Sequence, residues 1–267
     1  MRKLKSIFQF YIHSSIHVAL AVVAFAVLRM KEMGLDLEFN FLFFMFLASV
    51  SGYNFVKFAG IAKLYHRRLT RQLKGIQLFS AAAFLLMLYF LFQLNLKSIL
   101  LLIGLSLINF VYAFPVFTNR KNLRNLSGVK IFIIALVWAS SCVLLPSLEF
   151  RITLNTFTIW QFVQQILMIL TLMIPFEIRD FKYDDQNLFT LPQILGIWKT
   201  KFLGSAILVL ILLIPIFNHE ISLLFTIPFS VLLFLLILFA SKNQHAYYAS
   251  FFVEVIPILS LLFYYLF

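Results

Sequence analysis

The residues best suited to chemistry in this chain form a cluster of acids and bases at positions 177–185. The chain has only 10 Asp and Glu among 267 residues, and four of these acids lie in the cluster beside Arg179 and Lys182. Asp180 and Asp184 are four residues apart, so a helix continuing through both would hold them on one face, about 6 Å apart. Such a pair can share Mg²⁺, which takes one or two carboxylates together with phosphate oxygens. Arg179 and Lys182 are suited to pair with phosphate. The alternative interpretation is a solvated helix end with i,i+4 charges.

The composition indicates what kind of scaffold positions this cluster. Hydrophobic residues form 63% of the chain, charged residues form 12%, and the mean hydropathy is +0.98. A soluble domain carries about 25% charged residues. The apolar residues come in continuous runs rather than in the alternating segments of a β-barrel. We therefore predict an all-α, polytopic membrane bundle in which residues 1–267 form a single transmembrane helical domain.

A helix needs about 20 mainly apolar residues to cross a bilayer. Nine stretches of the chain meet this requirement. The predicted spans are residues 9–29, 39–61, 75–93, 97–115, 129–147, 156–176, 201–217, 220–240 and 246–266. The short polar stretch Asn218-His219-Glu220 separates the seventh span from the eighth.

The basic residues predict the orientation of these spans, because cytoplasmic loops are enriched in Lys and Arg. Of the 22 Lys and Arg residues, only Arg29, Lys31, Lys97 and Arg151 fall on the side opposite the N-terminus. The chain is therefore predicted to be N-in/C-out, with its long charged loops in the cytoplasm. The net charge of +12 follows from this topology and from attraction to anionic lipids, so no nucleic-acid partner is expected. We predict that the chain is a multi-pass protein of the cell's inner or plasma membrane.

Two stretches together resemble a known family. Glu-Ile-Arg-Asp-Phe-Lys-Tyr-Asp-Asp at 177–185 and Thr-Leu-Pro-Gln-Ile-Leu-Gly at 190–196 resemble the second aspartate-rich region of the UbiA-type intramembrane prenyltransferases. A weaker resemblance covers Tyr112-Ala-Phe-Pro and Gly128. The resemblance implies nine transmembrane helices, and it implies transfer of a prenyl group from an isoprenoid diphosphate to an aromatic or lipid acceptor with Mg²⁺ as cofactor. It assigns Asp180 and Asp184 to the metal and, with Arg179, to catalysis. Lys182 and Tyr112 are assigned to substrate binding.

The first motif of that family is largely absent. The family carries Asn-Asp-x-x-Asp-x-x-x-Asp at the end of its second helix, and here only Asn54 matches. The three aspartate positions hold Phe55, Phe58 and Ala62. Basic residues nearby either meet the diphosphate directly as cations or are ordinary positive-inside residues. With Asn54, the candidates for substrate binding here are Lys57, Lys63, Arg67, Arg68 and Arg71.

Polar residues inside the predicted spans leave further alternatives. Glu254 lies mid-span, where an acid usually faces a cavity or pairs with another helix. His13 and His17 have the i,i+4 spacing of a metal pair, but no third ligand is near them in the sequence, so hydrogen bonding between helices or an interfacial position is the favoured explanation. The leading functional hypothesis is a prenyltransferase-like membrane enzyme. The alternative is a non-catalytic lipid-binding or assembly protein on the same scaffold, and a transporter is disfavoured because no internal repeat is evident.

Overall fold

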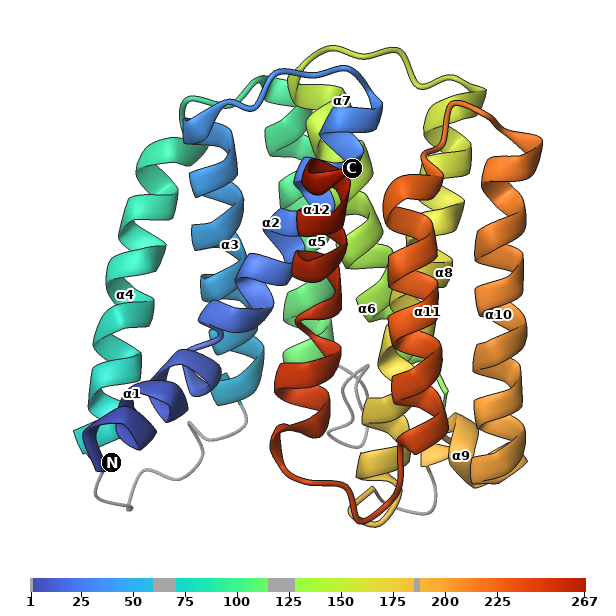
Figure 1. The fold of residues 1–267 in the computed structure, drawn as a ribbon. Coiled ribbons are helices and arrows are strands. Elements are labelled where there is room, and N and C mark those ends of the chain that lie inside the picture. The colour runs from blue at the N-terminus through green and yellow to red at the C-terminus, as the bar shows by residue number, and fades with distance from the viewer. Residues whose placement is uncertain (1, 60–70, 115–127, 185–187) are drawn as a thin grey trace.

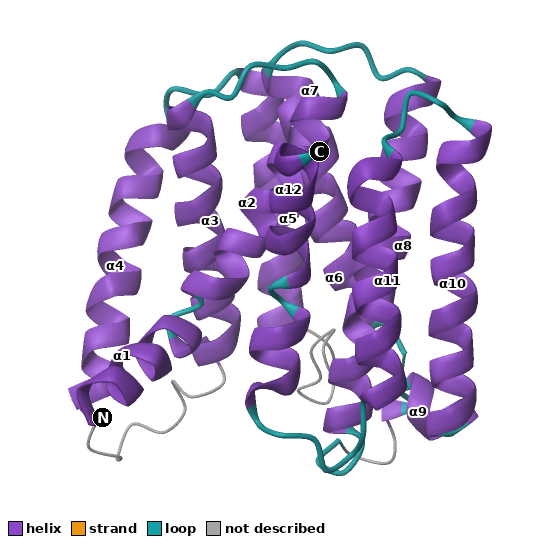
Figure 2. Cartoon of the chain, viewed as in Figure 1, coloured by secondary structure: helices purple, strands orange, loops and turns teal. Residues whose placement is uncertain are grey.

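The computed structural model describes residues 2–59, 71–114, 128–184 and 188–267, and within these ranges the chain consists of helices and connecting loops without a strand (Figures 1 and 2). The prediction of an all-α membrane bundle is confirmed for this part of the chain. The helices are α1 (Arg2–His13), α2 (Ile16–Glu32), α3 (Phe39–Ala59), α4 (Arg71–Leu91), α5 (Leu96–Ala113), α6 (Lys130–Ala139), α7 (Leu145–Glu149), α8 (Thr156–Asp180), α9 (Leu191–Leu195), α10 (Ile197–Phe217), α11 (Leu223–Phe239) and α12 (Ile256–Leu266). Two π-helical segments, η4 (Ser140–Leu144) and η6 (Tyr248–Val253), lie within longer helical runs.

The helices are long and apolar enough for a polytopic membrane protein. Seven helical runs in the described ranges can each cross a bilayer, and the bent pair α1–α2 makes an eighth if it counts as one span. Helix α11 has 17 residues and falls just short of the same length. Counting α11 as a crossing would bring the total to the predicted nine. The number of spans stays a prediction. The presence of several membrane-spanning helices is confirmed.

The first span is not the single straight helix predicted over residues 9–29. The chain bends by 55° between α1 and α2, and Ser15 adopts a left-handed conformation with φ 64°. Such a break leaves backbone carbonyls without their helical partners. Side chains of α3 replace those partners, because Asn54 Nδ2 donates to the Ser14 carbonyl and Lys57 Nζ donates to the His13 carbonyl, both at 3.0 Å. The bend is therefore stabilised by contacts distant in sequence.

The predicted turn between the seventh and eighth spans is confirmed. Helix α10 ends at Phe217, and Asn218 Oδ1 accepts a hydrogen bond from the Glu220 backbone N–H at 3.2 Å. Helix α11 then begins with Ser222 as its N-cap, its Oγ accepting from the Leu224 N–H at 3.1 Å. Short polar side chains that satisfy helix ends in this way are the ordinary start and stop signals of helices.

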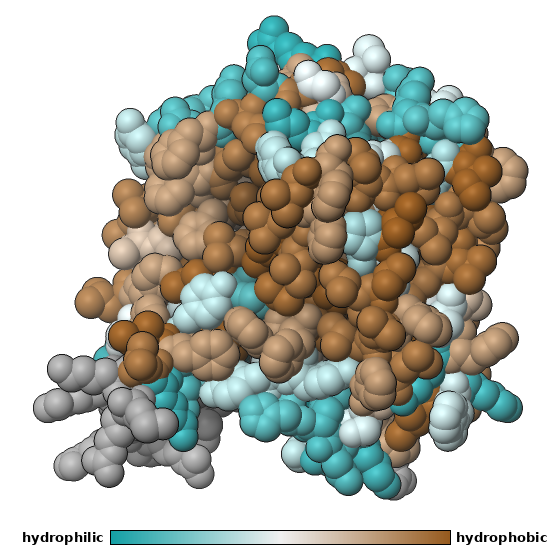
Figure 3. Space-filling model, in the orientation of Figure 1, coloured by the Kyte–Doolittle hydropathy of each residue, from teal (hydrophilic) through white to brown (hydrophobic). Residues whose placement is uncertain are grey.

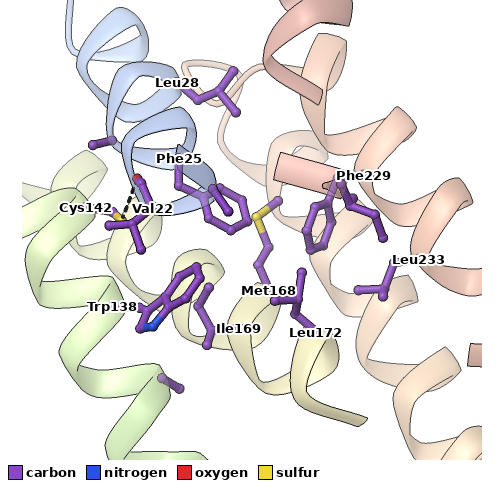
Figure 4. Close-up of a cluster of buried hydrophobic side chains, with 14 of the residues drawn as sticks. Val22, Phe25, Leu28, Trp138, Cys142, Met168, Ile169, Leu172, Phe229 and Leu233 are labelled. Carbon is purple, nitrogen blue, oxygen red and sulfur yellow. Dashed lines mark hydrogen bonds between the residues drawn. The ribbon is translucent and has the colours of Figure 1, made fainter. Parts of the chain in front are cut away.

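The core lies where α2, α6, α8 and α11 meet (Figure 4). The Phe25 ring packs against the rings of Phe229 and Trp138, with ring centroids 5.7 and 6.4 Å away. Helices α8 and α10 approach each other closely at Gly204, where an added Cβ would lie 2.5 Å from Ile174 Cδ1. Small residues that permit such close approach are typical of helix contacts in membranes.

The outer surface is also apolar, as expected for helices that face lipid. Large hydrophobic side chains are exposed along α4, α5, α10 and α11, among them Leu85, Leu107, Val209 and Leu235. In Figure 3 the hydrophobic residues (brown) form a broad band across the molecule, and hydrophilic residues (teal) gather above and below it. A soluble monomer rarely exposes so much continuous apolar surface. The chain is an integral membrane protein.

The two termini lie at opposite ends of the bundle (Figure 1). The N-terminus lies at the same end as α9 and the last turn of α8 (the lower end in Figure 1), and we call this the N-terminal end of the bundle. The C-terminus lies toward the other end of the bundle. The charge bias predicts that the N-terminal end faces the cytoplasm.

This orientation is testable with reporter fusions. Fusions made after residues 190 and 243 should report a cytoplasmic location, because both positions lie on the side that holds 18 of the 22 basic residues. A fusion at the C-terminus should report the opposite side. An external signal at residue 190 would contradict the predicted orientation.

Candidate functional site

Helix α8 carries the acidic cluster to the N-terminal end of the bundle. Its first turn is capped by Asn155, whose Oδ1 accepts a hydrogen bond from the Thr158 N–H at 3.0 Å, and it runs for 25 residues to Asp180. The α-helix ends at Asp180 and does not continue through Asp184, because residues 181–183 form a turn. The Asp184 N–H still donates to the Asp180 carbonyl at 2.9 Å. The backbones of the two acids therefore remain joined by a helix-like turn.

A lysine from another helix lies among these acids. Lys130, the first residue of α6, places Nζ 3.0 Å from Glu177 Oε1 and 3.7 Å from Asp180 Oδ2. It also interacts electrostatically with Asp184. Gly128 positions the start of α6 next to the segment that follows α8. Its φ of +69° favours glycine, and its N–H donates to the Leu188 carbonyl at 3.0 Å. One ammonium thus pairs with two carboxylates of α8, and the charge of Asp184 acts on it at longer range.

The predicted catalytic arginine pairs with one of the predicted metal ligands. Arg179 Nε donates to Asp180 Oδ1 at 2.7 Å, and its guanidinium lies 5.1 Å from the centre of the Phe176 ring. Lys182 is exposed, with Nζ 4.8 Å from the centre of the Tyr183 ring. The structure therefore brings Arg179 and Asp180 into contact at the end of α8.

The predicted substrate residues of α3 are engaged within the protein. The Asn54 side chain is buried, accepts from Ser15 Oγ at 2.8 Å, and donates to the Ser14 carbonyl and to Ser80 Oγ. Lys57 is exposed and donates to the His13 carbonyl. Asn54 thus ties α3 and α4 to the bend between α1 and α2. Its role toward a substrate stays a prediction.

The structure describes only some of the other residues predicted to bind substrate. Tyr112 is buried in the last turn of α5. Arg71 begins α4, but its side chain is outside the part of the structure that is described. Lys63, Arg67 and Arg68 lie outside the described residues altogether.

Sequence reasoning did not select Glu177 or Lys130 as site residues. Glu177 is three residues before Asp180, a spacing that places side chains on one helix face, so its position was visible in the sequence. Lys130 follows the glycine already noted at the start of the predicted fifth span. Its pairing with α8 is a contact between helices, and no local pattern predicts such a contact.

A small pocket adjoins the acidic cluster. It has a volume of about 160 Å³ and lies between the start of α6, the last turns of α8 and residues 188–194. Lys130 and Glu177 form part of its wall, and the rest is mainly apolar. Ligand pockets usually measure about 300–1,000 Å³. This pocket can therefore hold a short apolar group beside the acids, and it is too small for a whole isoprenoid diphosphate.

The acids chemically suit a divalent cation. Carboxylate oxygens are the ligands Mg²⁺ prefers, and Mg²⁺ commonly needs only one or two of them when substrate phosphates complete its shell. No group of three His, Cys, Asp or Glu side chains in the described ranges is arranged to hold a metal alone. Asp180 and its neighbours therefore fit a metal that arrives with a phosphate-bearing ligand.

Comparison with known proteins identifies the class to which this fold belongs. No protein-family profile matches the chain, and no curated protein matches it. Solved structures do match. A structure of digeranylgeranylglyceryl phosphate synthase is 18% identical, covers 100% of this chain and 98% of its own, and superposes with a TM-score of 0.56.

Two structures of a UbiA homologue from Archaeoglobus fulgidus are also similar. The one bound to GPP and Mg²⁺ is 14% identical, with coverages of 96% and 95% and a TM-score of 0.53. The one bound to DMAPP and Mg²⁺ is 13% identical, with coverages of 96% and 94% and a TM-score of 0.51. At these identities the likeness establishes the fold. The chain has the fold of the UbiA-type intramembrane prenyltransferases over its whole length, as the resemblance at 177–196 predicted.

The position of Lys130 leads to a prediction about metal binding. Its ammonium occupies the side of Glu177 and Asp180 where a cation would bind, so it should compete with free metal ions. The Lys130→Gln substitution should therefore raise the affinity for Mn²⁺, without any diphosphate, by about tenfold or more, equivalent to about 1.4 kcal/mol. Titration by electron paramagnetic resonance measures this directly.

The matched control is Lys199→Gln, since Lys199 is exposed and at the same end of the bundle. It should leave the Mn²⁺ affinity unchanged. Equal or weaker Mn²⁺ binding in the Lys130→Gln variant would show that these carboxylates do not form a metal site.

Proposed function

We propose that the protein is an intramembrane prenyltransferase that binds an isoprenoid diphosphate at the N-terminal end of the bundle and transfers its prenyl group to an aromatic or lipid acceptor. The observation that carries this proposal is the grouping of Glu177, Asp180, Arg179 and Lys130 at the end of α8. Acids and bases thus lie together at one point of a fold shared with a UbiA homologue, two structures of which contain DMAPP and Mg²⁺ or GPP and Mg²⁺. Together these features suit recognition of a diphosphate with its metal.

The chain's own cations have a clear task in such a reaction. When the allylic C–O bond breaks, negative charge develops on the diphosphate, and donors fixed in advance stabilise it. Arg179 and Lys130 are held at the end of α8 by Asp180 and Glu177, so they already lie where the phosphate oxygens are proposed to bind. Lys182 is exposed beside them and is proposed to meet the diphosphate from the cytoplasmic side.

Asp180 and Asp184 are proposed to hold Mg²⁺ through their carboxylates, with Glu177 adjoining them. When bound, Mg²⁺ supplies charge neutralisation on the leaving diphosphate. Lys130 and Arg179 must then give up part of their contact with the acids, and the phosphate oxygens provide them with a new anionic partner.

The α3 side of the site differs from the family pattern in charge. Phe55 and Phe58 stand where the family has aspartates, so a second metal is not proposed. Lys57 is the cation that α3 offers instead. Lys63, Arg67, Arg68 and Arg71 are proposed to contribute further positive charge around the diphosphate.

A second candidate function is a non-catalytic lipid-binding or assembly protein on the same fold. The observation that favours it is the use of Asn54 and Lys57 to stabilise the bend between α1 and α2. If their only role is structural, α3 has no group left for a diphosphate. In both candidates we propose the inner or plasma membrane as the location, with the N-terminus in the cytoplasm.

One binding experiment separates the two candidates. The purified protein should bind radiolabelled GPP in the presence of Mg²⁺, and removal of Mg²⁺ with EDTA should weaken that binding by at least about tenfold, since one metal bridge is worth more than 1.4 kcal/mol. Absence of GPP binding both with and without Mg²⁺ would refute the prenyltransferase proposal and favour the lipid-binding protein.

A further inference from the structure

The pocket beside the acidic cluster has the features of a binding site in its own right. It lies between the start of α6, the last turns of α8 and residues 188–194. Two polar side chains in its wall, Glu177 and Thr190, are only 2% and 5% exposed. A few polar groups in an otherwise apolar wall are typical of sites for small organic molecules. The opening, the size and the polar atoms of the pocket together define the ligand that it suits.

The pocket opens on the outer side of the seam between α6 and α8. Helix α6 buries Ala135 and Trp138 in the hydrophobic core. Phe132 and Leu136 lie four residues apart on another face of this helix, and they are 55% and 40% exposed. Phe132 lines the pocket, so the opening is on the exposed face of α6. That face belongs to the apolar outer surface of the bundle, and a ligand would therefore enter from the bilayer.

The size of the pocket matches one six-membered ring. Its volume is about 160 Å³, and an apolar protein cavity of about 150 Å³ binds benzene. A fused pair of rings is too large to fit inside. An aliphatic tail attached to a bound ring would stay outside the pocket, in the lipid.

Two phenylalanines favour an aromatic ring over a segment of aliphatic chain. Phe132 and Phe189 both line the pocket, and each is more than half exposed. Aromatic rings in edge-to-face or offset contact attract each other more than their buried area alone implies. Phe189 has a φ of +46°, in a region that bulky residues rarely adopt. Strained backbone of this kind is concentrated at functional sites, which suits a ring held at the mouth of a binding pocket.

The polar atoms of the pocket keep unused capacity for hydrogen bonds. Thr190 Oγ1 is buried, and its O–H donates to no group among the described residues. Glu177 Oε1 lies 3.0 Å from Lys130 Nζ, and among the described residues no other group donates to this carboxylate. A carboxylate has about four acceptor sites, so Glu177 can accept further bonds. Because buried polar atoms in native proteins are usually satisfied, the pocket offers a ligand one donor and one acceptor.

A hydroxyl group complements both of these atoms. Its oxygen can accept from the Thr190 O–H, and its hydrogen can donate to the Glu177 carboxylate. An ammonium group cannot accept from Thr190, and an ether or carbonyl group cannot donate to Glu177.

We propose that this pocket binds the ring of a monocyclic phenol that enters from the bilayer, with any aliphatic tail left in the lipid. The binding needs neither GPP nor Mg²⁺. The inference therefore goes beyond the proposed prenyltransferase function and does not depend on it.

Three probes with the same hexyl tail test the class of ligand. 4-Hexylphenol has one ring and a hydroxyl group, hexylbenzene has the ring alone, and 6-hexyl-2-naphthol adds a second ring. Binding of each tritiated probe would be measured on the purified protein in phosphatidylcholine nanodiscs without GPP or Mg²⁺, after subtraction of empty nanodiscs. 4-Hexylphenol should saturate one site. The other two should bind at least about tenfold more weakly, one through lost hydrogen bonds and the other through steric exclusion.

A substitution at the mouth tests the location. Ile194 lines the pocket and is 61% exposed, so Ile194→Trp should block the opening without disturbing the core. It should weaken binding of 4-hexylphenol by at least about tenfold. The matched control is Leu195→Trp, at the next residue of α9, which is exposed and does not line the pocket. It should bind 4-hexylphenol as the wild type does.

A substitution of Thr190 tests the hydrogen bond. Thr190→Val keeps the shape of the side chain and removes its hydroxyl group, so it should weaken binding of 4-hexylphenol by about fivefold, as expected for one lost hydrogen bond. Binding of hexylbenzene should not change, whereas a distorted pocket would weaken both probes. Thr190→Ser restores the hydroxyl group and should restore the affinity for 4-hexylphenol.

The remaining outcomes would overturn the inference. Equal binding of all three probes, or no saturable binding of 4-hexylphenol, would show that the pocket does not select a monocyclic phenol. Wild-type affinity for 4-hexylphenol in Ile194→Trp would place the bound probe elsewhere on the protein. In each of these cases the proposed diphosphate site would stand, because its test is the binding of GPP with Mg²⁺. Failure to bind GPP would refute the proposed function and leave the phenol site untouched.

Discussion

The Asp180→Asn substitution should weaken Mg²⁺-dependent GPP binding by about 100-fold, or roughly 2.7 kcal/mol, in line with the loss of one charge-stabilising group in an enclosed site. Asp180 is the residue on which the site converges, since it touches Arg179 at 2.7 Å and Lys130 at 3.7 Å. The amide keeps the shape of the side chain and removes its charge. The measurement is GPP affinity at saturating Mg²⁺.

The control for this prediction is the same measurement of GPP affinity without metal. In EDTA the substitution should have no effect or should tighten GPP binding, because it removes a negative charge that repels the diphosphate and frees Arg179. Asp36→Asn, an identical change at an exposed position between α2 and α3, should have no effect in either condition. A loss of affinity in EDTA as large as that in Mg²⁺ would show that Asp180 supports the fold and holds no metal.

Much of the fold was predictable because membrane helices follow local rules. The apolar runs have to be about as long as the bilayer is thick, and helix ends are marked by short polar side chains such as Asn155 and Ser222, which cap α8 and α11. The likeness to solved structures confirms the fold class that residues 177–196 suggested. These features depend on neighbours along the chain, so one sequence reveals them.

The bend between α1 and α2 could not be predicted in the same way. Neither Ser14 nor Ser15 is a strong helix breaker, and the bend depends on hydrogen bonds from Asn54 and Lys57, about 40 residues away. Only part of the candidate site could likewise be predicted from the sequence. The spacing of Asp180 and Asp184 was visible, whereas the pairing of Lys130 with Glu177 requires knowledge of which helices are neighbours.

A buried ion-pair network at the end opposite the acidic cluster carries the largest expected effect on stability. The Arg29 and Glu32 side chains are 0% and 1% exposed and lie 2.8 Å apart. Arg29 also donates to Gln164 and Gln165 of α8, each at 2.8 Å. Glu32 accepts in turn from the Ser222 N–H at 2.8 Å. The network therefore joins α2, α8 and the start of α11.

Replacement of Arg29 by Met should lower the free energy of unfolding by about 3–5 kcal/mol, because it leaves Glu32 buried without its cation. For a chain of this size that loss corresponds to a fall in Tm of about 6–20 °C in detergent, at roughly 2–4 °C per kcal/mol. Lys97→Met, at an exposed position near the same end, should change Tm little. The double variant Arg29→Met/Glu32→Gln should regain part of the loss, since no unpaired charge remains. A Tm in Arg29→Met equal to that of the control would mean that the pair's desolvation cost cancels its attraction, and that α2 and α8 are held together by apolar packing alone.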